Sequence, residues 1–85
     1  QIPPLTEERR LELAKVIRRV AEEGRVGIRN VRHEAIEAAK GLEKSKKISE
    51  DESRHGQKEA QKLTDRLIAE VDQAMAKKEQ EIKSI

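Results

Sequence analysis

The sequence predicts an all-α protein made of two long antiparallel helices, and three observations lead to this prediction. Charged residues make up 42% of the 85 residues and hydrophobic residues 34%, a mixture typical of long amphipathic helices. Aromatic residues are absent, so any core must be aliphatic. Apolar residues recur at a heptad spacing along two segments that a short polar connection separates. The chain starts at Gln1 and not at a methionine, so we expect it to be part of a longer protein.

The first helix is predicted over residues 7–46. Pro3 and Pro4 favour an extended backbone before it, and Thr6 is a suitable N-cap. The apolar residues that follow form a stripe along one side of the helix, which we expect to be buried. The stripe has two columns: Ala14, Ala21, Ile28, Ala35 and Leu42, and beside them Ile17, Gly24, Val31 and Ala38.

Two glycines, Gly24 and Gly27, lie inside this first predicted helix. Each should destabilise the helix by about 1 kcal/mol relative to alanine. Because a glycine has no side chain, a second backbone can approach it closely, and we interpret both glycines as packing positions.

The second helix is predicted over residues 50–84, after a turn at 47–49. Ser49 and Glu52 have the spacing of a capping box, which marks a helix start. The connection is so short that the two helices should run antiparallel. Both apolar stripes are wider than a two-stranded seam, so a third helix is expected from elsewhere in the same protein or from a partner. The apolar positions of the second helix are Ala60, Leu63, Leu67, Ile68, Val71, Ala74, Met75 and Ile82.

Several kinds of chemistry are not expected of this sequence. It contains no cysteine, which excludes disulfides and thiolate metal sites, and no apolar run long enough to span a membrane. His55 lies between Glu52 and Glu59 at helical spacing, but a solvated helix start explains this pattern better than a metal site. We find no phosphate-binding glycine loop and no catalytic triad. The chain is therefore not expected to be an enzyme, or to hold a metal or cofactor.

The basic residues are concentrated in the first half of the chain. Residues 1–47 hold 12 Lys or Arg and 8 Asp or Glu, whereas residues 48–85 hold 7 and 9. Four arginines fall on one side of the first helix, and we call them the arginine column. Guanidinium groups in such a row can contact successive phosphates, and Asn30 and His33 lie beside them and can add polar contacts. The arginine column consists of Arg18, Arg25, Arg29 and Arg32.

The arginine column has an alternative interpretation, in which its members pair with Glu22 on the same helix or with acids on a neighbouring one. If the column does bind nucleic acid, the absence of aromatic residues argues against base stacking and favours the backbone of folded RNA. Two other functions stay open at this point. The chain could be a coiled-coil module for protein interaction, or the tRNA-binding helical arm of a synthetase.

Several ordered blocks of the sequence are similar to the C-terminal part of bacterial ribosome recycling factor, and together they span nearly the whole chain. The blocks are PPLTEERR (Pro3–Arg10), EEGRVGIRNVRHEA (Glu22–Ala35), LEKSKKISEDE (Leu42–Glu52), QKLTD (Gln61–Asp65) and KKEQEI (Lys77–Ile82).

This resemblance implies a fold, partners and a set of site residues. The two helices would belong to the three-helix bundle of domain I, whose first helix and inserted β domain lie outside this chain, with Pro3 and Pro4 in the hinge. The family acts in the cytoplasm with elongation factor G to dissociate the post-termination ribosome, and it binds 23S ribosomal RNA of the large subunit across the A and P tRNA sites. His33 stands where many members carry a basic residue. In the family the arginines of the R-V-x-x-R-N-x-R block contact RNA, and the resemblance assigns this role to Arg25, Arg29 and Arg32, with Asn30 between them. Together with Arg18 and His33, which follow from helical spacing, the RNA-binding residues expected here are Arg18, Arg25, Arg29, Asn30, Arg32 and His33.

Overall fold

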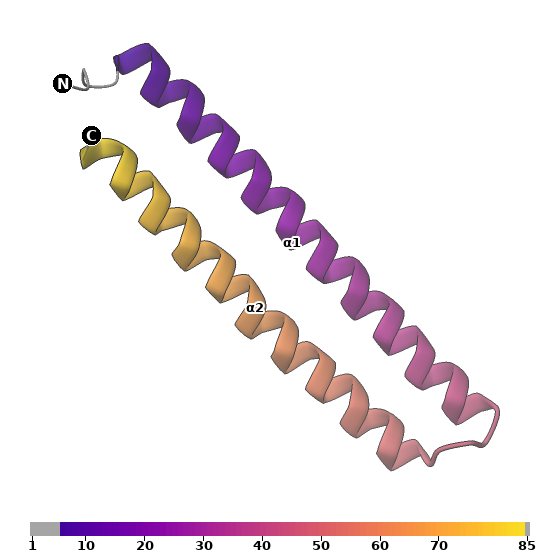
Figure 1. The fold of residues 1–85 in the computed structure, drawn as a ribbon. Helices are drawn as coiled ribbons and strands as arrows, with labels where there is room; N and C mark the ends of the chain where they lie inside the picture. Colours follow the sequence, from indigo (N-terminus) through magenta and orange to yellow (C-terminus); the bar gives the residue numbers. More distant parts are fainter. Residues whose placement is uncertain (1–5, 85) are drawn as a thin grey trace.

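The computed structural model describes residues 6–84 as two helices, α1 (Glu7–Lys44) and α2 (Glu50–Ser84). They run antiparallel, so that the start of α1 and the end of α2 lie at the same end of the molecule (Figure 1). The pair forms a rod of 65 × 16 × 15 Å. The predicted fold class, all-α with two long antiparallel helices, is confirmed. Pro3 and Pro4 fall outside the described residues.

The N-termini of both helices are capped as the sequence predicts. Thr6 is extended, with φ −70° and ψ 158°, and its hydroxyl oxygen accepts a hydrogen bond of 3.1 Å from the backbone N–H of Arg9. At α2, the backbone N–H of Glu52 donates to Ser49 Oγ at 3.0 Å, and the backbone N–H of Ser49 donates to Glu52 Oε1 at 3.1 Å. This reciprocal pair is a complete capping box.

The capping box also affects the titration of Glu52. The hydrogen bond from the backbone of Ser49, followed by that from its side chain, lowers the pKa of the Glu52 carboxyl below its ordinary value. Since the folded state lowers this pKa, the box contributes stability above the ordinary carboxyl pKa and loses that contribution as the pH falls through the lowered one.

The C-terminus of α1 differs from the prediction, because the helix ends at Lys44, two residues before the expected position 46. The reason is that Lys46 adopts a left-handed conformation with φ 62°. In this conformation the N–H groups of Lys46 and Lys47 reach back to the carbonyls of Glu43 and Leu42, at 3.0 and 2.9 Å. The last carbonyl groups of the helix are thereby satisfied, as in the turns that usually place glycine at this position.

Replacing Lys46 with glycine should therefore stabilise the protein by about 1 kcal/mol, because glycine adopts a positive φ without a steric penalty from Cβ. The free energy of unfolding can be measured by urea titration with far-UV circular dichroism. Lys46→Ala is the matched control, since it removes the charge but keeps Cβ. An equal gain in the alanine variant would attribute the effect to charge and contradict the conformational explanation.

The seam between α1 and α2 is narrow and is built from small residues. Ala21, with 7% of its surface exposed, is the one buried hydrophobic residue among residues 6–84, and Ser53 and Thr64 are the buried polar ones. Ser53 is 0% exposed, and its hydroxyl donates to the carbonyl of Ala39 at 3.4 Å and accepts from Gln57 Nε2 at 3.1 Å. The two helices thus approach closely around Ser53 but enclose little apolar volume.

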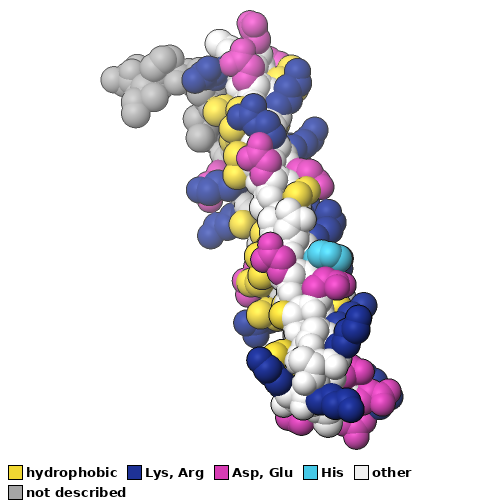
Figure 2. Space-filling view, turned by 90° about the vertical axis from the view of Figure 1, so that its right-hand side faces the viewer, with side chains coloured by type: hydrophobic (Ala, Val, Ile, Leu, Met, Phe, Trp, Pro, Cys, Tyr) yellow, Lys and Arg dark blue, Asp and Glu magenta, His cyan; other side chains and the backbone are white. Residues whose placement is uncertain are grey.

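A large part of the apolar stripe of α1 is left uncovered by α2. Val31 is 65% exposed and Leu42 is 41% exposed. The physical reason is that α2 covers only one sector of α1, while the neighbouring apolar sector faces no other element of the described chain. In Figure 2, hydrophobic side chains accordingly show in a row along the length of the rod, between charged ones.

Part of this uncovered surface is an apolar groove between the helices. Gly24 lines the groove, and a Cβ added at Gly24 or Gly27 would meet no atom within 4 Å. The close approach expected at these glycines is therefore not made by α2. The groove is lined by Val16, Ile17, Val20, Ala21 and Gly24 from α1 and by Val71, Ala74, Met75 and Lys78 from α2.

Candidate nucleic-acid interface

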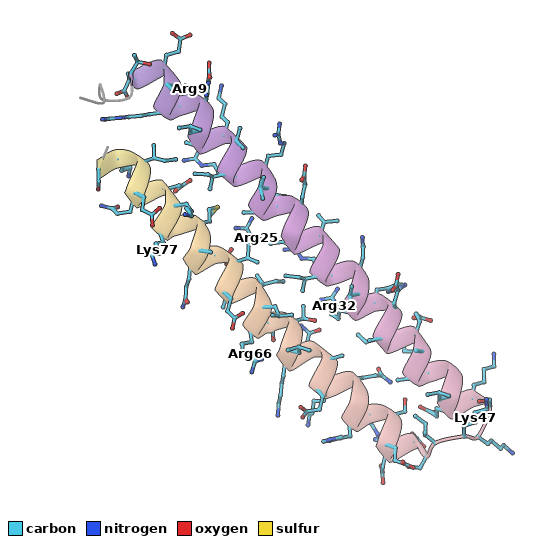
Figure 3. All side chains as sticks on the ribbon, viewed as in Figure 1. Arg9, Arg25, Arg32, Lys47, Arg66 and Lys77 are labelled. Carbon is cyan, nitrogen blue, oxygen red and sulfur yellow. The ribbon has the colours of Figure 1, made fainter. Side chains whose placement is uncertain are left out.

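The arginine column lies on the edge of α1 that meets α2, on a sector adjoining the seam. Figure 3 shows Arg25 and Arg32 extending from α1 on the side of α2. The four arginines differ widely in accessibility: the side chain of Arg18 is 69% exposed, whereas that of Arg25 is only 15% exposed. The column is thus partly built into the contact between the helices.

Arg25 is bound on several sides by groups of the same chain. Its Nε donates to Asp72 Oδ1 on α2 at 2.8 Å, and a terminal nitrogen lies 2.6 Å from the same oxygen. The other terminal nitrogen, Nη1, donates to Glu22 at 3.0 Å, whereas Nη2, the one beside Asp72, also donates to Met75 Sδ at 3.6 Å. The hydrogen bonds with Asp72 and then Glu22 raise the pKa of Arg25 above its ordinary value. Arg25 therefore ties α1 to α2.

Arg18 and Arg29 also have acidic partners within the chain. Arg18 Nε donates to Glu79 Oε1 on α2 at 2.9 Å. A terminal nitrogen of Arg29 lies 3.6 Å from Glu22, which therefore serves Arg25 and Arg29 together. In each of these ion pairs the side chain of at least one partner is exposed to solvent, and exposed ion pairs contribute little net stability. A phosphate group can replace such a carboxylate at a guanidinium, because both offer paired oxygen acceptors.

Arg32 is the exception in the column. Within residues 6–84 its guanidinium makes no hydrogen bond and no ion pair, although the side chain is half-buried. The side chains of Asn30 and His33 are exposed and likewise make no hydrogen bond to the described part of the chain. The structure thus leaves the donors of Arg32 available to a ligand.

A second column, which sequence reasoning missed, faces the arginines from α2. Asp65, Asp72 and Glu79 are spaced seven residues apart, and we call them the acid column. The signal was present in the sequence, because their spacing equals that of Arg18, Arg25 and Arg32 and antiparallel helices place such columns opposite each other. Choosing these acids among the nine of the second half, however, requires the register of the helices.

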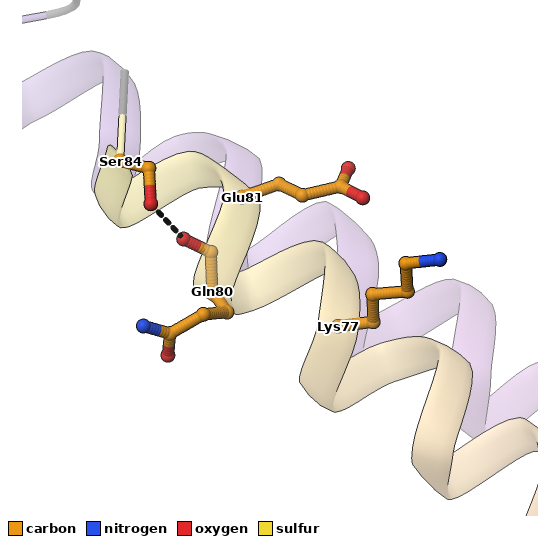
Figure 4. A pocket seen from close by; sticks show the side chains of 4 residues that line it. All are labelled: Lys77, Gln80, Glu81 and Ser84. Carbon is orange, nitrogen blue, oxygen red and sulfur yellow. Dashed lines mark hydrogen bonds between the residues drawn. The ribbon is translucent and has the colours of Figure 1, made fainter.

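Another hollow of the described surface, near the end of α2, is lined by Lys77, Gln80, Glu81 and Ser84, which are exposed side chains of a single helix (Figure 4). Ser84 Oγ donates there to the carbonyl of Gln80 at 3.1 Å.

Two further observations concern residues 6–84 only. Residues 6–84 contain no group of three carboxylate or imidazole side chains that could hold a metal ion, and this includes the surroundings of His55. Neither helix in this range has an apolar stretch long enough to cross a lipid bilayer.

Residues 6–84 thus form an elongated helical hairpin that carries a row of arginines along one edge, which places the chain among the long-helix hairpin proteins. A family model for ribosome recycling factor matches residues 1–82. The chain belongs to the ribosome recycling factor family.

Individual relatives agree with this assignment. The chain is 60% identical over 84 residues to the ribosome-recycling factor of Symbiobacterium thermophilum and 56% identical over 81 residues to that of Thermus thermophilus. It is 55% identical over 84 residues to that of Neisseria gonorrhoeae. These alignments cover 95–99% of this chain but only 44–45% of each relative. The chain therefore spans less than half the length of the relatives it matches.

Proposed function

We propose that the chain is the RNA-binding part of a ribosome recycling factor and that it binds 23S ribosomal RNA of the large subunit across the A and P tRNA sites. In the whole protein, acting with elongation factor G in the cytoplasm, it would help to dissociate the post-termination ribosome. The chain contributes by binding and by its rod shape, without a cofactor and without catalysis.

The observation that carries this proposal is the state of Arg32. A half-buried guanidinium without an acidic partner among the described residues is unfavourable in the free protein unless a ligand or water satisfies it. A phosphate of the RNA backbone supplies two acceptor oxygens in the geometry that a guanidinium prefers. Together with membership of the family, this makes Arg32 the leading candidate for contact with ribosomal RNA.

The other members of the proposed site contribute in different ways. Arg18 and Arg29 are exposed and can exchange their carboxylate partners for phosphate. Arg25, at 15% exposure, is the least accessible and would exchange Asp72 or Glu22 only with local rearrangement. Polar contacts to sugar or phosphate would come from Asn30 and His33, whose side chains are exposed.

The apolar groove supports a further part of the proposal, the three-helix bundle that the family resemblance implies. We propose that a helix of the same protein outside this chain fills the groove. Gly24 has open space above it there, so the backbone of that helix could approach α1 closely. This would also explain why Val16 and Val20 stand uncovered in the described chain.

Chemical footprinting tests the proposed binding site directly. The chain is added to purified large ribosomal subunits, and the reactivity of 23S ribosomal RNA is compared with and without it. We expect protection of nucleotides that line the A and P tRNA sites. Unchanged reactivity at those nucleotides, at chain concentrations that saturate binding, would contradict the proposal.

The exposed groove also favours a second candidate function, a coiled-coil module that recruits a helix of another protein. Salt distinguishes the two candidates. Binding to phosphates weakens linearly in a plot of log affinity against log salt, whereas apolar helix docking shows no such dependence. The third possibility, the helical arm of a synthetase, is set aside by the family assignment.

A further inference from the structure

The arginine and acid columns have the same seven-residue spacing and lie opposite each other on the two helices, but one of their three possible ion pairs is not formed. Arg18 binds Glu79 at 2.9 Å, and one heptad further along α1 Arg25 binds Asp72 at 2.8 Å. Because the helices are antiparallel, each step of seven residues forward along α1 is matched by seven residues backward along α2. The next step places Asp65 opposite Arg32.

Asp65 does not bind Arg32, and its carboxylate has another partner. Gln61 Nε2, one helical turn earlier on α2, donates a hydrogen bond of 2.9 Å to Asp65 Oδ1. No nitrogen of Arg32 lies within 4.0 Å of a carboxylate oxygen of the described residues. The third ion pair is thus not formed: Arg32 has no acidic partner among the described residues, and Asp65 is hydrogen-bonded to Gln61 of its own helix.

We propose that Gln61 keeps Arg32 available for RNA by holding Asp65, so that Gln61 is a positioning residue of the binding site and Asp65 is the competing carboxylate that it restrains. The inference rests on the proposed role of Arg32 as a phosphate contact. It adds residues of α2 to a site that otherwise lies wholly on α1.

Asp65 can bind either Gln61 or Arg32, and these two interactions have similar energies, so the loss of one side chain can change which of them forms. A Gln–Asp hydrogen bond between residues four apart on a helix contributes about 0.2–0.5 kcal/mol. An exposed Arg–carboxylate pair contributes about 0.2–1 kcal/mol, a similar amount. Without Gln61, the carboxylate of Asp65 loses its only hydrogen bond among the described residues. We then expect this carboxylate to turn toward Arg32, the unpaired cation that the register of the two columns places opposite it.

The two ion pairs that are formed, Arg18 with Glu79 and Arg25 with Asp72, show how a pair between Arg32 and Asp65 would affect RNA binding. In the first and second pairs the carboxylate occupies the same guanidinium nitrogens that a phosphate would need. A closed third pair would therefore compete with RNA for Arg32.

The test uses three variants of the chain, Gln61→Ala, Asp65→Asn and the double variant, in binding to purified large ribosomal subunits over a range of salt concentrations. We expect Gln61→Ala to weaken binding by about two- to fivefold, the range that one competing exposed ion pair gives. The slope of log affinity against log salt should fall by up to about 1. Asp65→Asn alone should change affinity by less than about twofold, because Asp65 is already held away from Arg32. The double variant should restore both affinity and slope.

Two controls separate positioning from other effects. Gln73→Ala removes an exposed glutamine of α2 whose side chain makes no hydrogen bond to the described residues, and it should leave binding unchanged. Gln61→Ala in an Arg32→Ala background should have no further effect. Alanine favours helix, so the helical content of each variant should equal that of the parent by circular dichroism.

The outcomes are distinguishable. If Arg32→Ala weakens binding but Gln61→Ala does not, the positioning role is wrong and the proposed function stands. The positioning role is equally wrong if Asp65→Asn fails to restore the affinity that Gln61→Ala lost. If Arg32→Ala itself leaves binding unchanged, the RNA contact is wrong and the inference about Gln61 falls with it.

Discussion

Arg32→Ala is expected to weaken binding of the chain to large ribosomal subunits by roughly 10- to 100-fold. Hydrogen bonds that involve a charged group contribute about 1.5–3 kcal/mol each, and this guanidinium has no acidic partner in the described chain that RNA would have to displace. One phosphate contact fewer should also lower the slope of log affinity against log salt by about 1. Affinity can be measured by co-sedimentation with purified subunits at several salt concentrations.

Arg19→Ala is the matched control for this prediction. Arg19 is an exposed arginine of α1 outside the column, and it too makes no ion pair with the described residues. Both substitutions lower the net charge equally, so a difference between them reports the position of the guanidinium. Equal losses of affinity would mean that overall charge governs binding, and the assignment of Arg32 would then be wrong.

The second large effect is expected on stability, from Ser53→Leu. Ser53 is 0% exposed where α2 packs on α1, so a leucine there must push the helices apart. Overpacking of this kind costs about 1–3 kcal/mol, and the lost hydrogen bonds to Ala39 and Gln57 add roughly 1 kcal/mol. With so little buried apolar surface elsewhere, this loss should remove most of the cooperative unfolding transition.

The measurement is urea titration followed by far-UV circular dichroism, with two controls. Ser53→Ala removes the hydrogen bonds without adding volume and should lose only about 1 kcal/mol. Ser84→Leu makes the same substitution at an exposed serine near the end of α2 and should change stability by less than about 0.5 kcal/mol. A Ser53→Leu variant that unfolds at the same urea concentration as the parent would show that the helices do not pack at this point.

The sequence predicts the local features of this fold well, because they depend on residues only a few positions apart. The Thr6 cap and the capping box of Ser49 and Glu52 involve hydrogen bonds over three residues. The end of α1 is predicted less well, since Lys46 stands where a glycine would have marked the left-handed position. The sequence marks Val31 as part of an apolar stripe, but which part of that stripe α2 covers depends on how the two helices are rotated against each other, and α2 leaves Val31 exposed.

The pairing of the arginine column is a different kind of problem, because it depends on the register between helices. Arg25 and Asp72 are 47 residues apart, and Arg18 and Glu79 are 61 apart. A shift of α2 by a single residue would rotate these acids away from the arginines. The arginine column itself follows from helical spacing, whereas the difference between the bound Arg25 and the unpaired Arg32 follows only from the structure.

Because the column is unevenly paired, its one guanidinium without a carboxylate partner among the described residues lies toward the hairpin connection. Carboxylates neutralise Arg18 and Arg25 toward the open end, while Arg32 stands uncompensated nearer the connection. Beyond it lie Lys44, Lys46 and Lys47, which also have no carboxylate partner in the described chain. The same tip carries Glu43, Glu50, Asp51 and Glu52, so residues 43–52 hold three cations and four carboxylates and have no positive excess. What distinguishes Arg32 for a phosphate is thus its own unpaired guanidinium, which acts at short range, and not a field of the whole rod.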